Sequence, residues 1–252
     1  MLQLIDFLER TFFKKKEKHQ KCVGIPLKIT QCVQSSARTL IKEKRKRCGM
    51  QAFWNAKFQT KSLIYGEAPN NFIKEHIELL VNAKTVICLG EGEGRNAIYL
   101  ADKGLEVEAL DISDVALLKL RRRAKESYVF IKTRHTLLEY WEPDTLYDAV
   151  VCTYLHLPKP NQKMLFEKSL QALKPNGYFI AELFSESQIH FSSGGPKDIA
   201  LLYDLNDILD TVKILPCKIV KLAQEVVVLN EGDKHVGRAS VIRVILQKLA
   251  QD

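Results

Sequence analysis

Apolar and polar positions alternate in blocks along most of the chain, and the spacing within each block predicts its structure. Short apolar runs bounded by glycine, proline or charged residues are typical of buried strands. Apolar residues three and four positions apart are typical of helices that pack on a core. The runs predict strands at 84–89, 106–110, 128–132, 148–153 and 178–183. Helices are expected at 72–80, 96–100, 114–125, 161–173 and 204–209.

The last part of the chain departs from this alternation. Two strands, about 225–229 and 240–247, follow each other with only residues 230–238 between them. Because no helix separates them, they are expected to pair antiparallel at one edge of the sheet. The alternation elsewhere predicts a parallel sheet covered on both faces. The pattern therefore predicts a doubly wound α/β fold with a mostly parallel seven-stranded sheet and an antiparallel edge hairpin.

Charge divides the chain at about residue 50. Residues 1–50 contain thirteen Lys and Arg against four Asp and Glu, so they carry the whole excess of a chain whose net charge is +8. We expect residues 1–49 to form a basic N-terminal extension and residues 50–252 to form the domain. Apolar residues between Leu2 and Phe13 are spaced for a short amphipathic helix, which could contact an anionic surface. A solvated basic tail is the alternative.

Composition excludes several classes of protein. No run reaches the roughly 18 apolar residues that a membrane span needs, and no secretory signal is evident at the start of the chain. The six cysteines show neither the C-x-x-C spacing nor the paired histidines of a zinc site, so no metal is expected. We expect a cytoplasmic protein with reduced thiols, of which Cys88 and Cys152 are buried and inert.

The chemistry is concentrated where the first predicted strand ends. A glycine loop, residues 90–94 (GEGEG), follows that strand directly, and Asp111 ends the next strand 21 residues after Gly90. Glycines allow the backbone to turn sharply and to approach a ligand closely. An acid at the end of the second strand can accept both hydroxyl hydrogens of a ribose. This layout predicts a cofactor that contains adenosine.

The residues within the loop distinguish between adenosine cofactors. Arg95 occupies the place where a dinucleotide fingerprint requires glycine, and the carboxylates of Glu91 and Glu93 would repel a pyrophosphate. S-adenosylmethionine has no phosphate, and its sulfonium and ammonium groups carry positive charge that loop acids favour. Arg95 could meet the cofactor's carboxylate or pair with a neighbouring glutamate. An NAD-dependent oxidoreductase is the opposing enzyme hypothesis.

Several motifs in a fixed order resemble those of class I S-adenosylmethionine-dependent methyltransferases, which have a Rossmann-like fold. The resemblance is strongest to the bacterial branch of tellurite-resistance and thiopurine methyltransferases, and it covers about residues 51–248. The motifs are 65–70 (YGEAPN), 86–101 (VICLGEGEGRNAIYLA), 107–113 (VEALDIS), 147–151 (YDAVV), 156–158 (HLP), 173–177 (LKPNG), 194–196 (GGP) and 231–238 (EGDKHVGR).

The resemblance implies a role in cofactor binding for ten residues. The glycine loop and Arg95 would meet the amino acid part, Asp111 the ribose, and Ile112 the adenine. Two positions depart from the family pattern, because Thr136 and Cys88 stand where relatives carry acids. The ten positions are Tyr65, Gly90, Glu91, Gly92, Arg95, Asp111, Ile112, Thr136, Leu137 and Thr153.

The residues after the fourth strand constrain the methyl acceptor most. His156 lies there and is the candidate base or substrate contact, with a structural role as the alternative; His235 and Arg238 are weaker candidates. The Asn/Asp-Pro-Pro motif of nucleic-acid amino methyltransferases is replaced by residues 152–155 (CTYL). A small-molecule acceptor with a soft nucleophile, a thiol or a chalcogen oxyanion, is therefore favoured over nucleic acid. A binding module that has lost turnover is the non-enzyme alternative.

Overall fold

The structure is a computed structural model that describes residues 48–250. Residues 48–53 belong to one compact unit, and residues 54–250 form another, which contains the sheet. The predicted extension and its amphipathic helix lie outside the described residues, apart from Cys48 and Gly49. No helix within residues 48–250 combines the length and the apolar character needed to cross a membrane.

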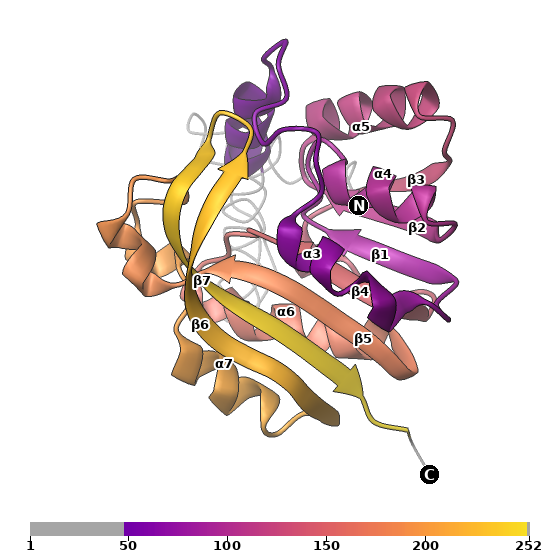
Figure 1. Cartoon of the computed structure of the whole chain (residues 1–252), viewed down its shortest axis with the longest axis vertical. Coiled ribbons are helices and arrows are strands. Elements are labelled where there is room, and N and C mark those ends of the chain that lie inside the picture. Colours follow the sequence, from indigo (N-terminus) through magenta and orange to yellow (C-terminus); the bar gives the residue numbers. More distant parts are fainter. Residues whose placement is uncertain (1–47, 251–252) are drawn as a thin grey trace, which may run out of the picture. The chain divides into compact units, whose positions relative to one another are not determined.

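One sheet of seven strands forms the centre of residues 54–250, in the order β3-β2-β1-β4-β5-β7-β6. Strands β1 to β5 are parallel, and β7 pairs antiparallel with both β5 and β6 (Figure 1). This arrangement confirms the predicted α/β fold with its antiparallel edge pair. The strands are β1 Thr85–Leu89, β2 Glu106–Asp111, β3 Ile131–His135, β4 Tyr147–Thr153, β5 Leu173–Phe184, β6 Cys217–Glu231 and β7 His235–Lys248.

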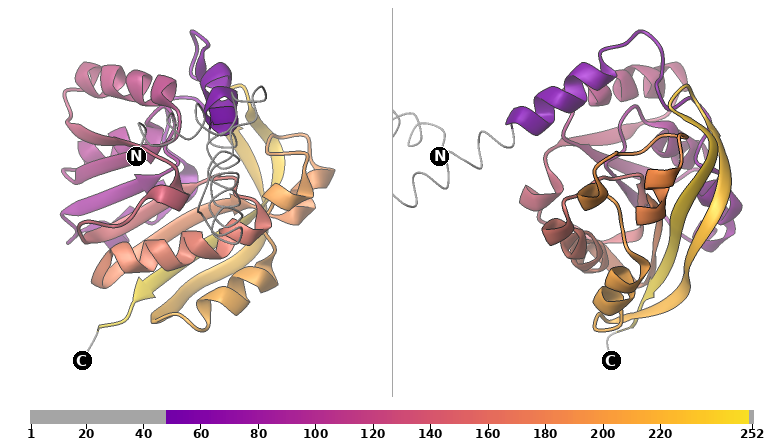
Figure 2. Two further views of the ribbon diagram at one scale, coloured as in Figure 1. Left: turned by 180° about the vertical axis from the view of Figure 1, so that it is seen from behind. Right: turned by 90° about the vertical axis from the view of Figure 1, so that its left-hand side faces the viewer.

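Helices cover both faces of the sheet and divide the core into two apolar layers. One layer joins the sheet to α3, α4 and α5, and the other joins it to α6 and α7. Figure 1 shows the first group in front of the sheet, and the reverse view in Figure 2 brings α6 forward. The helices are α3 Asn71–Glu75, α4 Arg95–Asp102, α5 Asp114–Glu126, α6 Lys159–Ala172 and α7 Leu205–Val212.

The predicted helix over 72–80 is broken in the structure. Helix α3 ends at Glu75, and a separate 3₁₀ turn, Ile77–Leu80, follows His76, whose φ of −116° is not helical. The side chain of Asn70 caps α3 by accepting a hydrogen bond from the Ile73 amide. Apolar spacing alone does not reveal the break, because Phe72, Ile73 and Leu80 are buried on both sides of it.

Three other predicted boundaries are wrong. Strand β3 begins at Ile131 rather than Tyr128, and the Tyr128 ring is 97% exposed. The hairpin strands β6 and β7 are much longer than expected, so that the predicted 230–238 connection shrinks to residues 232–234. Residues 174–177, which separate the predicted helix 161–173 from the predicted strand 178–183, lie within β5, where the pairing with β4 is irregular and Asn176 adopts a φ of 64°.

The strand order reverses between β1 and β4, since β2 lies on one side of β1 and β4 on the other. Loops that leave the carboxyl ends of these two strands diverge to opposite faces, which opens a crevice where ligands of such sheets bind. The glycine loop follows β1 and His156 follows β4, so both lie at this end of the sheet.

Candidate active site

Positive backbone angles set the course of the glycine loop. Gly90, Gly92 and Gly94 have φ values of 65°, 64° and 91°, which disfavour any other residue. A Cβ atom on Gly90 would lie 2.8 Å from a Leu155 side-chain carbon, and one on Gly94 would lie 2.5 Å from Leu120. The loop therefore passes directly over the end of β4 and against α5, where a side chain would fill the space.

Glu91 closes the loop onto helix α4. One carboxylate oxygen, Oε1, accepts hydrogen bonds of 2.8 Å from the backbone amides of Asn96 and Ala97 in the first helical turn. Burial disfavours the charged form more than these bonds and the nearby Arg95 favour it, and the pKa of Glu91 rises to about 7. Within the described part of the chain only the Cys88 thiol adds to these donors, so the carboxylate keeps acceptor capacity for a ligand.

Asp111 holds the other side of the loop. Its two carboxylate oxygens accept backbone hydrogen bonds from Gly92 at 2.8 Å and from Ser113 at 2.7 Å. Burial raises its pKa, although these two bonds oppose the rise. A carboxylate oxygen can accept more than one hydrogen bond, so Asp111 can hold the loop and still accept hydrogen bonds from a ligand's hydroxyl groups.

The predicted adenine contacts gather beside Asp111. The Thr136 amide donates to the Asp111 carbonyl at 3.1 Å, so the end of β3 is tied to the end of β2. Ile112 and Thr136 are half-buried and Leu137 is nearly buried. The Thr136 hydroxyl donates only a long, 3.4 Å bond to the Leu137 carbonyl. The structure thus brings these three residues to one corner of the site.

Arg95 pairs with a glutamate far along the chain. It is only 7% exposed, and its Nη2 lies 3.0 Å from Oε2 of Glu231 on β6. Its other terminal nitrogen, Nη1, is buried without a hydrogen-bond partner in the described residues. The guanidinium carbon lies 5.9 Å from the centre of the Tyr154 ring. Arg95 therefore pairs with a distant glutamate rather than with the neighbouring one that the sequence suggested, and one donor remains unused.

Thr153 and the two predicted buried thiols line the floor of the site. The Asn96 amide of α4 donates to the Thr153 hydroxyl at 3.0 Å, so the first turn of α4 is fixed to the end of β4. Cys88 and Cys152 are buried, as expected, and burial raises the pKa of both thiols. Neither thiol is suited to act as a nucleophile, because the thiolate form is disfavoured.

Aromatic rings gather beyond the end of β4. The His156 ring is nearly parallel to Trp54 and to Phe184, with centroids 6.2 Å and 6.0 Å away. His235, from β7, packs against the same group at 5.2 Å from Phe184 and 4.5 Å from Tyr65. Tyr65, His156 and His235 are thus brought together, whereas Arg238 of the same hairpin is exposed.

Positive charge surrounds these rings. Lys57 Nζ lies 4.8 Å from the Trp54 ring centre and 5.4 Å from that of Tyr65, and it has no ion pair among the described residues. Burial, together with Lys57 and His235, lowers the pKa of His156 to about 3. Burial and the charge of Lys234 also lower the pKa of Lys57. His156 is therefore neutral at physiological pH and is a weak base.

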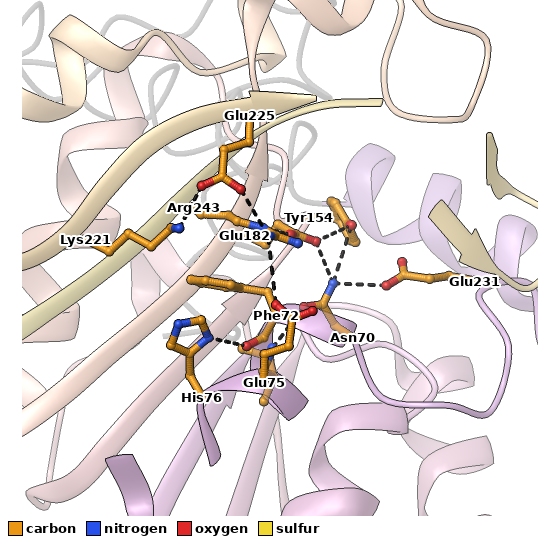
Figure 3. Close-up of polar contacts among 11 residues, drawn as sticks. Asn70, Phe72, Glu75, His76, Tyr154, Glu182, Lys221, Glu225, Glu231 and Arg243 are labelled. Atoms are coloured by element: carbon orange, nitrogen blue, oxygen red, sulfur yellow. Dashed lines mark hydrogen bonds and ion pairs between the residues drawn. The ribbon is translucent and has the colours of Figure 1, made fainter. Parts of the chain in front are cut away.

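A buried polar network next to these rings is absent from the sequence-based hypotheses. Asn70 connects two buried glutamates, Glu182 of β5 and Glu231 of β6, with Tyr154 beside them (Figure 3). A signal for Glu182 was available, because it is a lone acid within an apolar strand. Asn70 and Glu231 fall within two of the motifs, 65–70 and 231–238, but no local signal marked their contact with each other across 161 residues.

Comparison with known proteins agrees with this geometry. Residues 86–177 match the model of a family described as a methyltransferase domain. The ubiquinone biosynthesis O-methyltransferase of Rickettsia akari is 26% identical over 122 residues, which is 48% of this chain. The match spans about half the length of that relative, 49%.

Solved structures of methyltransferases share the fold over most of the chain. TehB from Haemophilus influenzae has a TM-score of 0.59 at 15% identity, covering 79% of this chain and 66% of its own. Magnesium protoporphyrin IX methyltransferase from Synechocystis PCC 6803, with bound SAM, has a TM-score of 0.57 at 16% identity and covers 80% and 96%. At such identities the likeness establishes the fold alone. Residues 86–177 thus match a methyltransferase domain, and together with the strand order and the ordered motifs this match supports a class I S-adenosylmethionine-dependent methyltransferase.

Proposed function

We propose that the protein transfers a methyl group from S-adenosylmethionine to a small molecule whose nucleophile is soft and anionic, a thiolate or a chalcogen oxyanion. The observation that carries the proposal is the division of charge across the site. At the cofactor end there are two carboxylates: Glu91 within the glycine loop, and Asp111, which accepts a hydrogen bond from it. At the other end, rings and the lysine Lys57 surround His156. A cationic cofactor and an anionic acceptor fit this division.

The residues around the loop fit the proposed cofactor part by part. Gly90 and Gly92 let the loop pack closely against the side chains of Leu155 and Phe58, which fixes the course of the backbone that would face the ligand. Asp111 would accept hydrogen bonds from the ribose, and Ile112 and Leu137 would pack on the adenine. The remaining acceptor capacity of Glu91 would face positive charge on the amino acid part. The unused donor of Arg95 suits the carboxylate of that same part.

Methyl transfer makes limited demands on the protein. S-adenosylmethionine supplies a methyl group already activated by its sulfonium. The chain has to align the nucleophile and exclude water, and rings such as Trp54 and Phe184 suit that task. His156, with its pKa lowered to about 3, would contact the acceptor at neutral pH as a neutral ring, in which one nitrogen carries a proton and the other accepts. An acceptor that arrives already deprotonated needs no stronger base.

Calorimetric titration with S-adenosylmethionine, S-adenosylhomocysteine and NAD tests the cofactor. We expect the first two to bind and NAD to give no heat of binding. Tight NAD binding without a response to S-adenosylmethionine would refute the proposal and favour an oxidoreductase. Binding of S-adenosylmethionine without transfer to any acceptor would favour a module that has lost turnover.

The acceptor class is tested by transfer of a labelled methyl group to a panel of small thiols, selenite and tellurite, with a matched set of neutral alcohols and with RNA. We expect transfer to the thiols and the chalcogen oxyanions, and none to the alcohols or to RNA. Lys57→Met should raise the KM for the anion while the S-adenosylhomocysteine dissociation constant stays within about threefold, because only the acceptor end loses charge. Lys61→Met, at an exposed position, is the matched control. An unchanged KM in Lys57→Met would argue against an anionic acceptor.

A further inference from the structure

The side chain of Asn70 joins segments that are distant in the sequence. It is fully buried, and its Nδ2 atom donates to Oε1 of Glu182 at 2.7 Å and to Oε1 of Glu231 at 3.0 Å (Figure 3). Glu182 is on β5, and Glu231 is at the end of β6, where the hairpin turns. A single amide therefore lies between two carboxylates and gives one hydrogen atom to each.

Each of these carboxylates also has a cationic partner. Arg243 Nε donates to Oε2 of Glu182 at 2.7 Å, and Arg95 Nη2 lies 3.0 Å from Oε2 of Glu231. The Tyr154 hydroxyl donates to Oε1 of Glu182 at 2.6 Å. The charges of these four side chains balance, two against two, although Arg243 also donates to Glu225 at 3.1 Å and lies 3.9 Å from Glu75. The amide is the neutral group that separates Glu182 from Glu231.

The remaining polar atoms of Asn70 extend the network to the floor of the site. Its backbone amide donates to Asn96 Oδ1 at 2.9 Å, and Asn96 in turn donates to the Thr153 hydroxyl. Its own Oδ1 accepts from the Ile73 amide at 3.3 Å. One residue thus contacts, directly or through one neighbour, the first turn of α4, the end of β4, the end of β5 and the hairpin.

Backbone packing keeps the hairpin close to the segment that carries Asn70. A Cβ atom on Gly232 would lie 2.3 Å from the Gly66 amide nitrogen, so the two backbones are in direct contact. His235, which follows the turn, lies 3.3 Å through Nδ1 from Glu231 Oε2 and packs on the ring of Tyr65. The position of Glu231 therefore determines where His235 and Arg95 lie.

We propose that Asn70 is a positioning residue for methyl transfer, which sets Arg95 and Thr153 at the cofactor end and the hairpin residue His235 at the acceptor end through one buried amide. The inference rests on the proposed function. Only an amide supplies two donors and one acceptor in this space. The isosteric substitution Asn70→Asp removes both donors and places a third carboxylate beside Glu182 and Glu231.

This substitution gives a test that depends on pH. At pH 8 three adjacent acids repel one another, Arg95 is displaced, and we expect the dissociation constant for S-adenosylhomocysteine to rise about tenfold or more relative to wild type. At pH 5.5 one of the three acids takes up a proton and again provides a donor, so the ratio should fall to within about threefold. Dividing by the wild-type value at each pH removes titrations that both proteins share, such as those of His235 and of Glu91, whose pKa is about 7.

A ratio that does not change with pH would overturn the proposal, because general damage to the fold has no reason to reverse on acidification. Asn206→Asp, at a position on α7 away from the site, is the matched control and should bind like wild type at both pH values. Failure of wild type itself to bind S-adenosylhomocysteine would instead refute the proposed function.

A double substitution keeps the test decisive if Asn70→Asp unfolds at pH 8. In Asn70→Asp combined with Glu231→Gln, the donor and the acceptor exchange places across that one contact and two acids remain as in wild type, although the new carboxylate still faces Glu182. We therefore expect partial recovery: the loss of affinity at pH 8 relative to Glu231→Gln alone should be smaller than the loss of Asn70→Asp relative to wild type. A double variant that is as weak as Asn70→Asp, or that also fails to fold, would overturn the proposal.

Discussion

Asp111 provides the sharpest test of where the cofactor lies, because Asp111→Asn preserves shape and removes only charge and one acceptor. The carboxylate accepts hydrogen bonds from the Gly92 and Ser113 amides, one on each oxygen. In the variant the new NH₂ group faces one of those amides, donor against donor. The substitution therefore perturbs both the glycine loop and any ribose that Asp111 holds, by amounts that can be measured separately.

The two effects have different expected sizes. A buried donor left without a partner costs about 1–3 kcal/mol, and relief of the buried charge offsets part of that cost, so we expect unfolding free energy to fall by about 1–2 kcal/mol. Loss of a charged acceptor for the ribose hydroxyls costs about 1.5–3 kcal/mol of binding, which is roughly a 10- to 150-fold higher dissociation constant.

Urea denaturation measures the first effect, and calorimetry with S-adenosylhomocysteine measures the second. Asp102→Asn is the matched control, since Asp102 is exposed at the end of α4 and pairs with the neighbouring Lys103. It should change neither quantity beyond error. A folded Asp111→Asn protein with a wild-type dissociation constant would show that Asp111 does not contact the ribose, and the assignment of the whole corner around it would fail.

Three other substitutions or conditions test the remaining assignments. Because the pKa of Glu91 is about 7 against 4.5 for an ordinary glutamate, the folded protein binds the extra proton between these values, and this contribution to stability is lost as pH rises through that window. A bound cation lowers the pKa of Glu91, so binding of S-adenosylmethionine should release a proton and its affinity should increase as pH rises through 7. Calorimetry in two buffers of different ionisation enthalpy measures the proton release. Glu91→Gln should abolish the release, and a release that persists in this variant would contradict the assignment. His156→Ala should lower turnover with the identified acceptor while the S-adenosylhomocysteine dissociation constant stays within about threefold; wild-type values of both would leave His156 a structural role. A chain that begins at Met50 should still fold and bind S-adenosylhomocysteine, and loss of either by circular dichroism or calorimetry would place residues 1–49 within the domain.

Strands buried on both faces are predictable from sequence, and edge strands are not. Strands β1 and β4 are continuous apolar runs because helices cover both of their faces, and their expected bounds agree with the structure to within one residue. Strand β3 is an edge strand with the polar sequence IKTRH, whereas the apolar Tyr128 and Phe130 before it are exposed. The hydrophobic pattern therefore placed this strand three residues too early.

Within the candidate site, too, local contacts are predictable from sequence and distant contacts are not. The glycine loop and Asp111 are 21 residues apart, and the strand–helix–strand unit between them fixes their geometry, so the sequence predicts their approach. The partners of Arg95 and Asn70 on the hairpin are more than a hundred residues away, and only the packing of the sheet brings them near. The low pKa of His156 likewise comes from burial beside Trp54 and Phe184, which sequence spacing does not encode.

The strand order has a consequence for the timing of folding during synthesis. Strand β7 is the last of the described strands to be made, yet it lies between β5 and β6. Until it emerges from the ribosome, β5 has an open edge, Glu182 lacks Arg243, and Glu231 has no paired strand to hold it beside Arg95. The glycine loop and Asp111 can fold on the nascent chain much earlier. Cofactor affinity should therefore develop in two stages, first with the glycine loop and Asp111 and later with the pairing of Arg95 and Glu231. A ribosome-bound intermediate that lacks β7 would have the first set of contacts without the second.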